Sequence, residues 1–149
     1  MDIYQKLKRE HDDHRELMRR IADTTGETDE RKRLFGLLVQ DVESHAAAEE
    51  QTLYSELIEA TEGQPQTRHS VAEHKQSSDY LDELRKTDMS SPAWLATFKK
   101  FREALEHHMR EEEQQVFGLS EELIDDERAA ELGVKFDGRK QVEQRRFRQ

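Results

Sequence analysis

The chain has 149 residues, which fits a single domain, and its formal net charge is −10. Charged residues make up 39% of it and cysteine is absent, which excludes disulfides, thiolate zinc sites and cysteine-ligated iron–sulfur clusters. An acidic protein repels nucleic-acid phosphates, and no apolar stretch approaches the roughly 18 residues that span a membrane. We therefore expect no nucleic-acid or membrane partner. Because the N-terminus lacks the apolar core of a signal peptide, we expect a cytoplasmic protein.

Turn signals divide the first 119 residues into four segments, none of which has a convincing strand pattern. Apolar residues recur at steps of three or four along each segment, which is the period of an amphipathic helix. The predicted helices cover about residues 2–23, 29–61, 66–86 and 92–119. Thr28 is the expected N-cap of the second helix, and Ser91 followed by Pro92 is a typical start of the fourth.

Amphipathic helices joined by short turns bury their apolar stripes against one another, so the expected fold is an all-α, up-down-up-down four-helix bundle. We assign residues 1–119 to this bundle and residues 120–149 to a short C-terminal helical extension with a basic tail. Ser120 is the expected start of a short fifth helix that ends before Gly133. Residues 134–149 are expected to be loosely held, and the extension is a candidate contact for a protein partner.

Histidines interrupt all four apolar stripes: His14, His45, His74 and His108. On the second and fourth helices a glutamate follows its histidine four residues later, as Glu49 and Glu112. Residues four apart lie about 40° apart around a helix and about 6 Å apart along it, so each pair faces the same interior. Burying a carboxylate is costly unless it is paired or bound to a metal. The pattern therefore predicts a metal site in the core of the bundle.

The sequence also contains an internal repeat. The pattern His-x3-Glu-Glu-x2-aliphatic-aromatic begins at His45 and again at His108, 63 residues later. Upstream of each copy lies an acid–histidine–base triplet, centred on His14 and on His74, and these triplets lie 60 residues apart. The chain therefore looks like two copies of one helical hairpin, which suits a nearly two-fold symmetric site with two metals.

The number and type of side chains indicate which metals would fit. Six protein ligands are too many for one zinc ion, whereas two ions that share two bridging carboxylates would use all six. Imidazole and carboxylate together suit iron, manganese or zinc, and carboxylate-bridged di-iron centres are familiar inside helical bundles. We expect two iron ions, with manganese or zinc as the alternatives, bound by His14, His45, Glu49, His74, His108 and Glu112.

The remaining histidines have simpler interpretations. His11 lies one turn before His14 and is the alternative ligand on the first helix. His69 lies about 140° around its helix from His74, and His107 points to the side of His108, so we expect both at the surface.

Three further glutamates neighbour the expected ligands. Glu50 and Glu113 follow Glu49 and Glu112 directly, about 100° around the helix, and we expect solvated charges there rather than partners of the ligand histidines. Glu111 and Glu113 also remain competitors of Glu112 for its place in the site.

At these residues the sequence resembles the hemerythrin-like, or HHE cation-binding, family over about residues 1–118. The motifs that carry the resemblance are Asp13-His14, His45-x3-Glu49-Glu50, Glu73-His74 and His108-x3-Glu112-Glu113. The resemblance implies two irons. His14 and His45 would bind one of them, His74 and His108 would bind the other, and Glu49 and Glu112 would bridge the two.

Two positions depart from the oxygen-carrying hemerythrins. Those proteins have a second histidine one turn before the ligand of the third helix, where this chain has Ser70. Their fourth-helix carboxylate is an aspartate five residues after its histidine, whereas Glu112 follows His108 by four, with Glu113 in the fifth place. The resemblance is therefore closer to the bacterial and regulatory branch of the family, which includes proteins that respond to iron, oxygen and nitric oxide.

We therefore expect a non-haem di-iron protein that binds or senses dioxygen, peroxide, nitric oxide or iron itself, rather than a turnover enzyme. Two alternatives stay open. One is a di-iron enzyme with oxidase, peroxidase-like or iron-centre repair activity, and the other is a metal-stabilised regulatory interaction module. A plain helical bundle without metal is the remaining interpretation.

Overall fold

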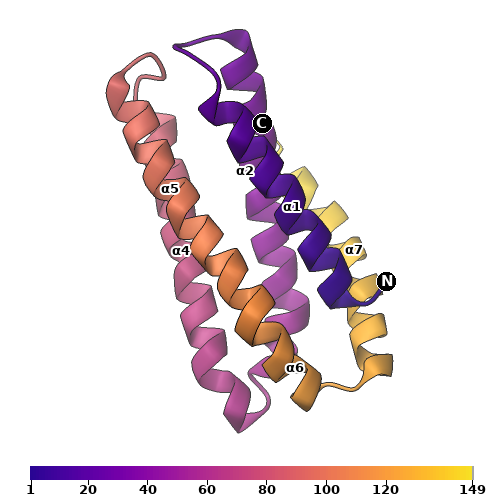
Figure 1. Cartoon of the computed structure of the whole chain (residues 1–149). Coiled ribbons are helices and arrows are strands. Elements are labelled where there is room, and N and C mark those ends of the chain that lie inside the picture. The colour runs from indigo at the N-terminus through magenta and orange to yellow at the C-terminus, as the bar shows by residue number, and fades with distance from the viewer. Residues whose placement is uncertain (149) are drawn as a thin grey trace.

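The structure is a computed structural model that describes residues 1–148, and it is helical almost throughout. Four long helices run in alternating directions (Figure 1): α1 (Ile3–Ala22), α2 (Asp29–Glu49), α4 (Gln64–Lys86) and α5 (Pro92–Glu111). The predicted all-helical class and the four long helices are confirmed. Within residues 1–148, none of the helices is both long and apolar enough to cross a membrane.

The predicted helix starts are those observed in the structure. The Thr28 hydroxyl accepts a hydrogen bond from the Arg31 backbone N–H, and the Ser91 hydroxyl accepts one from the N–H of Ala93. Pro92 occupies the first turn of α5, where its missing N–H costs nothing. These caps fix where α2 and α5 begin, and therefore which of their residues reach the middle of the bundle.

Helices α2 and α5 each pass into a π-helical turn at the end of the His-x3-Glu motif. Glu49 is the last residue of α2, and Glu112 is the first residue of the turn after α5. These turns are η1 (Glu50–Tyr54), followed by α3 (Ser55–Leu57), and η3 (Glu112–Val116), followed by α6 (Phe117–Leu123). A 3₁₀ turn, η2 (Thr61–Gly63), then leads into α4. Single π-helical turns inside α-helices often mark functional sites, and here the same distortion occurs in both copies of the repeat.

The C-terminal segment differs most from the prediction. Helix α7 (Asp126–Arg146) is 21 residues long and lies along α1 and α2, on the side away from α4 and α5 (Figure 1). The expected short helix that ends before Gly133 is therefore wrong, as is the loose tail over most of its length. The predicted bundle of four helices is also incomplete, because α7 adds a fifth long helix to it. Gly133 lies inside α7, next to the N-terminal backbone. A Cβ atom at this position would come within 2.9 Å of the Met1 carbonyl oxygen, so the glycine permits close packing of α7 against the N-terminus. Gln149, the last residue of the expected tail, lies outside the described residues.

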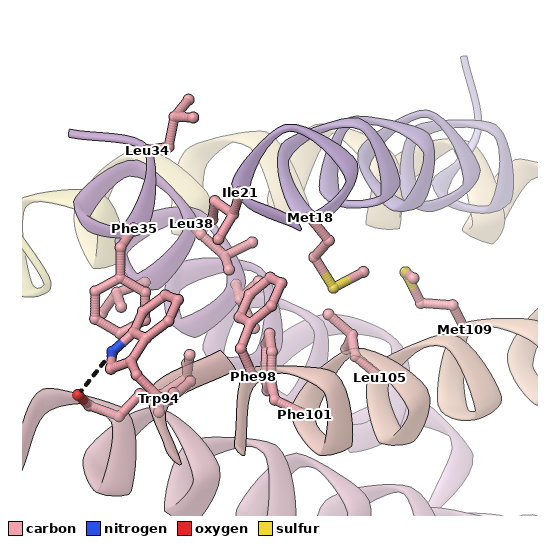
Figure 2. Close-up of a cluster of buried hydrophobic side chains, with 14 residues drawn as sticks. Met18, Ile21, Leu34, Phe35, Leu38, Trp94, Phe98, Phe101, Leu105 and Met109 are labelled. Atoms are coloured by element: carbon pink, nitrogen blue, oxygen red, sulfur yellow. Dashed lines mark hydrogen bonds between the residues drawn. The ribbon is translucent and has the colours of Figure 1, made fainter. Parts of the chain in front are cut away.

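Two apolar clusters fill the core, one toward each end of the bundle. Figure 2 shows the first cluster, in which Trp94 stacks on Phe98 with ring centroids 5.5 Å apart and meets Phe35 edge-on. The Trp94 indole Nε1 donates to the carbonyl of Leu84 at 3.2 Å, which satisfies its polar atom (Figure 2). The second cluster lies where α1 and α7 meet the end of α2, the turns η1 and η3, and the short helices α3 and α6, and it includes Phe136. The polar residues that interrupt the helical stripes fall between these two clusters.

Candidate metal centre

Buried histidines and glutamates converge in the polar band between the two apolar clusters. Their ligand atoms form two groups whose members lie within 4.8 Å of one another: His11, His45, Glu49 and Glu112 in the first, and Glu49, His74, His108 and Glu112 in the second. Each of these side chains belongs to a residue that is at most 8% exposed. The structure thus brings five of the six sequence-predicted ligands together, and places His11 rather than His14 with them.

Glu49 faces both groups. Its Oε1 lies 2.9 Å from His74 Nε2, and its Oε2 lies 3.7 Å from His45 Nε2. Neighbouring ligand atoms around one metal ion are separated by about 3.0–3.4 Å when each lies about 2.1 Å from the metal. These two contacts lie close to that range, and the two carboxylate oxygens face different histidines, so each oxygen would be available to a different ion.

Glu112 repeats this arrangement from the opposite hairpin. Its Oε1 lies 3.0 Å from His11 Nε2, and its Oε2 lies 3.5 Å from His108 Nε2. Each glutamate thus presents one oxygen to each histidine pair, and the two halves are related by the repeat seen in the sequence. This is the geometry expected of two bridging carboxylates.

Most of the atoms that face the centre have no hydrogen-bond partner, although they lie close to one another. These fully buried, unpartnered atoms are Nε2 of His11, His74 and His108, both carboxylate oxygens of Glu49, and Oε1 of Glu112. Leaving such an atom unpaired costs about 1–3 kcal/mol, and more for a charged group. A cation at the middle of each group would satisfy all of them at once, so the residues fit a pair of metal ions.

The second ring nitrogen of each histidine, Nδ1, is bound by a glutamate outside the centre at 2.7–2.8 Å. The pairs are His11 with Glu113, His45 with Glu10, His74 with Glu50, and His108 with Glu73. A carboxylate partner holds the proton on Nδ1 and leaves the Nε2 lone pair facing inward, as metal-binding histidines require. The expectation that Glu50 and Glu113 are merely solvated charges is therefore wrong.

The carboxylates also control the protonation of the imidazoles. Burial alone would lower the pKa of His45, but Glu10 and Glu49 outweigh it and raise that pKa to about 10. Burial alone would raise the pKa of Glu112, but His108 and His11 hold it well below its usual range. In the metal-free protein, protonated histidines therefore balance the negative charge of the buried carboxylates. A metal ion that binds must displace these protons.

His14 lies beside the centre without facing the shared glutamates. Its ring meets that of His45 edge-on, with centroids 4.9 Å apart, and its Nε2 lies 2.9 Å from Asp41 Oδ2. Complete burial lowers the pKa of His14 to about 4, so its ring is neutral. Lys140 of α7 contacts Asp41 at 2.9 Å and Glu10 at 2.6 Å. His14 thus lies beside a partly buried ion-pair network. Both of its ring nitrogens lack a hydrogen-bond partner, and its ligand atoms form a third group with those of Glu10 and His45, which does not include the shared glutamates.

A signal for His11 was present in the sequence. His11 and His74 are 63 residues apart, which is the offset that relates the two His-x3-Glu motifs. The preceding residues, Glu10 and Glu73, share that offset, whereas His14 and His74 are only 60 apart. A strict requirement for one offset would have selected the Glu-His pair at 10–11 in place of the Asp-His pair at 13–14.

The repeat is broken at one position next to the centre. The Tyr54 hydroxyl donates to Glu112 Oε2 at 2.5 Å, whereas the residue 63 positions later is Phe117, whose ring stacks over His11 at 6.3 Å. Tyr54 therefore packs in the second apolar cluster and also donates to a carboxylate of the ligand groups, whereas Phe117 has no polar atom with which to do so. Ser70 is fully buried and accepts a hydrogen bond from Gln66 at 3.2 Å.

A small enclosed cavity of about 20 Å³ adjoins the histidines, with room for about one water-sized molecule. Its lining combines imidazoles with apolar and small side chains: His11, His14, Val42, Glu43, His45, Ala46, His74, Ser77, Leu105, His108 and Met109. A small ligand placed there would contact the inner ring of histidines and the buried apolar side chains of Leu105 and Met109.

Comparison with known proteins agrees with this site. Residues 2–120 match the family described as Hemerythrin HHE cation binding domain. The chain is 31% identical over 140 residues to an uncharacterized protein of Mycobacterium tuberculosis, covering 93% of this chain and 85% of that one. It is 29% identical to the crystal structure of a hemerythrin HHE cation binding domain-containing protein from Mycobacterium kansasii, with a TM-score of 0.87 over 98% of this chain and 89% of that one.

A more distant likeness involves a larger protein. The DNA nickase of Nostoc sp. is 23% identical over 113 residues, which are 76% of this chain but 32% of the nickase. The family match covers most of the chain and includes all the histidines and glutamates of the two ligand groups. The chain therefore belongs to the hemerythrin HHE cation-binding domain family.

Proposed function

We propose that the protein holds a pair of iron ions that bind or respond to a small ligand such as dioxygen, peroxide or nitric oxide. In this proposal one ion is bound by His11 and His45 and the other by His74 and His108, with two bridging carboxylates, Glu49 and Glu112. The observation that carries the proposal is the set of buried, unpartnered Nε2 and carboxylate oxygen atoms that converge in the middle of the bundle. His11 replaces the His14 of the sequence-based expectation, because His14 faces Asp41.

The ring of outer glutamates determines how well the ligands are oriented. Glu10, Glu50, Glu73 and Glu113 each accept a hydrogen bond from one ligand imidazole, so four rings are held in the tautomer that binds metal. Two shared carboxylates and neutral imidazoles favour iron or manganese over a closed zinc site, which takes four ligands around one ion. Iron remains the proposed metal, with manganese and zinc as the alternatives.

The cavity beside the histidines supports a small ligand. When bound, reduced iron can supply electrons to such a ligand. The chain itself provides a space of about 20 Å³, and the buried apolar side chains of Leu105 and Met109 form part of its lining. The neutral His14 ring also lines this space and offers a polar contact. These features support ligand binding more directly than they support a turnover reaction.

Iron analysis and an absorption spectrum of the aerobically purified full chain test this proposal. We expect two irons per chain and near-ultraviolet charge-transfer bands, with both strongly reduced in Glu49→Gln. The matched control is Glu30→Gln, since Glu30 lies on the same helix, is exposed, and belongs neither to the ligand groups nor to the lining of the cavity. Less than one metal per chain in the wild type, or equal iron in Glu49→Gln and wild type, contradicts the proposal.

A second candidate function, a metal-stabilised regulatory module, is favoured by one contact. Lys140 of α7 binds Glu10, which in turn binds the ring of His45, so the C-terminal helix is linked to the centre through two side chains. Metal binding that fixes His45 would then stabilise the docking of α7. Limited proteolysis should show slower cleavage within residues 126–146 in the iron-loaded protein, and identical cleavage with and without iron argues against this function.

A further inference from the structure

A second cluster of metal-ligand residues lies outside the buried centre, on the surface where α4 and α5 run side by side. It contains one histidine–glutamate pair at i, i+4 spacing from each helix, His69 with Glu73 and His107 with Glu111. Three of these side chains already form a group whose ligand atoms lie within 4.8 Å of one another: His69, Glu73 and Glu111. We propose that this His69–Glu73–His107–Glu111 cluster, the surface cluster, binds one divalent transition-metal cation, and that zinc is the ion it suits best.

The distances within the surface cluster match those between ligands of one ion. His69 Nε2 lies 3.0 Å from Glu111 Oε1 and 3.4 Å from Glu73 Oε2. His107 Nε2 lies 3.3 Å from Glu111 Oε2 and 3.6 Å from Glu73 Oε2. Ligand atoms about 2.0–2.1 Å from a tetrahedral zinc ion are about 3.3–3.4 Å apart. Three of the four ligand atoms already lie within 4.8 Å of one another, whereas His107 contacts both carboxylates from outside that group, so its ring must turn toward His69 for all four side chains to bind one ion.

The two carboxylates are held in place by residues outside the surface cluster. Glu73 is 14% exposed and uses its Oε1 to accept a hydrogen bond from His108, which leaves Oε2 directed toward the exposed histidines. Glu111 is 15% exposed and accepts a hydrogen bond from Gln66 at 3.2 Å. Fixed carboxylates reduce the entropy that a cation must overcome when it orders its ligands.

The histidines supply the flexible half of the site. The His69 side chain is 53% exposed and that of His107 is 68% exposed, so both are accessible from solvent. Among residues 1–148, no lysine or arginine lies within ion-pair distance of Glu73 or Glu111, in contrast to the Glu10–Asp41 pair that Lys140 neutralises. The two negative charges of the surface cluster are thus available to balance one divalent cation, and imidazole with carboxylate suits zinc.

Glu73 connects the surface cluster to the buried centre. One of its oxygens accepts from His108, a ligand of the proposed inner pair, and the other lies within the surface cluster. Among the described residues, the side chains of His69, His107 and Glu111 make no hydrogen bond to an inner ligand, although His107 and Glu111 directly precede His108 and Glu112 in the sequence. We therefore expect their replacement to leave the Nδ1 hydrogen bonds of the inner histidines in place.

Equilibrium dialysis of the iron-loaded full chain against zinc, with iron and zinc counted by elemental analysis, tests the proposal. We expect wild type to bind one zinc more than the His69→Ala/His107→Ala double variant, with unchanged iron. Glu111→Gln should bind this zinc at least about 10-fold more weakly, since even partners outside a ligand shell change metal affinity by about 10–100-fold.

The matched control is Glu103→Gln, which removes an exposed carboxylate one turn before His107 on the same helix. It should retain the full zinc content. Equal zinc binding by wild type and the double variant overturns the proposal, as does a loss in Glu103→Gln as large as that in the double variant. Because the readout is a difference in zinc between variants, it holds whichever metal occupies the inner centre.

Discussion

Replacement of Glu10 by glutamine tests whether the outer glutamates control the metal centre. Glu10 Oε1 accepts from His45 Nδ1 at 2.8 Å, and the carboxylate is only 19% exposed, so solvent screens this interaction weakly. Glutamine retains an acceptor oxygen but loses the charge that makes the imidazole a stronger ligand. Losing an outer-shell partner costs about 10–100-fold in metal affinity, and we expect the lower end, about 10-fold or about 1.4 kcal/mol.

The assay is competition for ferrous iron between the protein and a chelator of known affinity, without oxygen. The matched control is Asp13→Asn, because Asp13 is the exposed acid that precedes His14, as Glu10 precedes His11. This variant should bind iron as wild type does. The reasoning is refuted if Glu10→Gln binds iron with wild-type affinity, or if Asp13→Asn weakens binding equally. Lys140 has a second carboxylate partner, Asp41, at 2.9 Å, so we expect this lysine to stay paired in the Glu10 variant.

Three further predictions concern the ligands, the pH dependence and the packing of α7. His11→Ala should retain at most half of the wild-type iron while His14→Ala retains all of it, and the opposite ranking by elemental analysis would restore His14 as the ligand. The pKa of His45 is raised to about 10, against 6.5 in the unfolded chain. The protonated ring therefore contributes its full stabilisation to the metal-free protein below pH 6.5, and this contribution is lost as pH rises through 10. Thermal unfolding should therefore show the metal-free protein losing stability between pH 7 and 10 more than the iron-loaded protein, and equal losses would contradict this. Gly133→Ala should cost about 1–3 kcal/mol because its Cβ meets the Met1 carbonyl oxygen, whereas Gly138→Ala, with open space at the same helix, should cost nothing in denaturant unfolding.

The helices of the bundle could be predicted because their apolar period and their caps are local properties of the sequence. Thr28 and Ser91 are predicted as N-caps from their positions just before the apolar period begins, and in the structure they cap α2 and α5. Helix α7 could not be predicted in the same way. Gly133 is typical of a helix end, but in the structure it lies inside α7, where the missing side chain lets the N-terminal backbone pack closely, and such a tertiary contact cannot be read from the local sequence.

The ligand positions on α2 and α5 could be predicted because each histidine is tied to a glutamate four residues later. On α1 the periodicity could not separate His11 from His14, since residues three apart share one face of a helix and both are buried. The choice depends on how α1 is rotated against α2, which places His14 against Asp41 and His11 against Glu112. The roles of Glu50 and Glu113 also depend on neighbouring helices, because their partners, His74 and His11, lie elsewhere in the chain.

A crystal structure of the iron-loaded full chain, with anomalous scattering recorded at the iron edge, tests the central claim most directly. We predict two anomalous peaks, one beside His11 and His45 and one beside His74 and His108, with Glu49 and Glu112 each in contact with both. A single peak, a peak bound by His14 in place of His11, or no peak between the two histidine pairs would contradict the account.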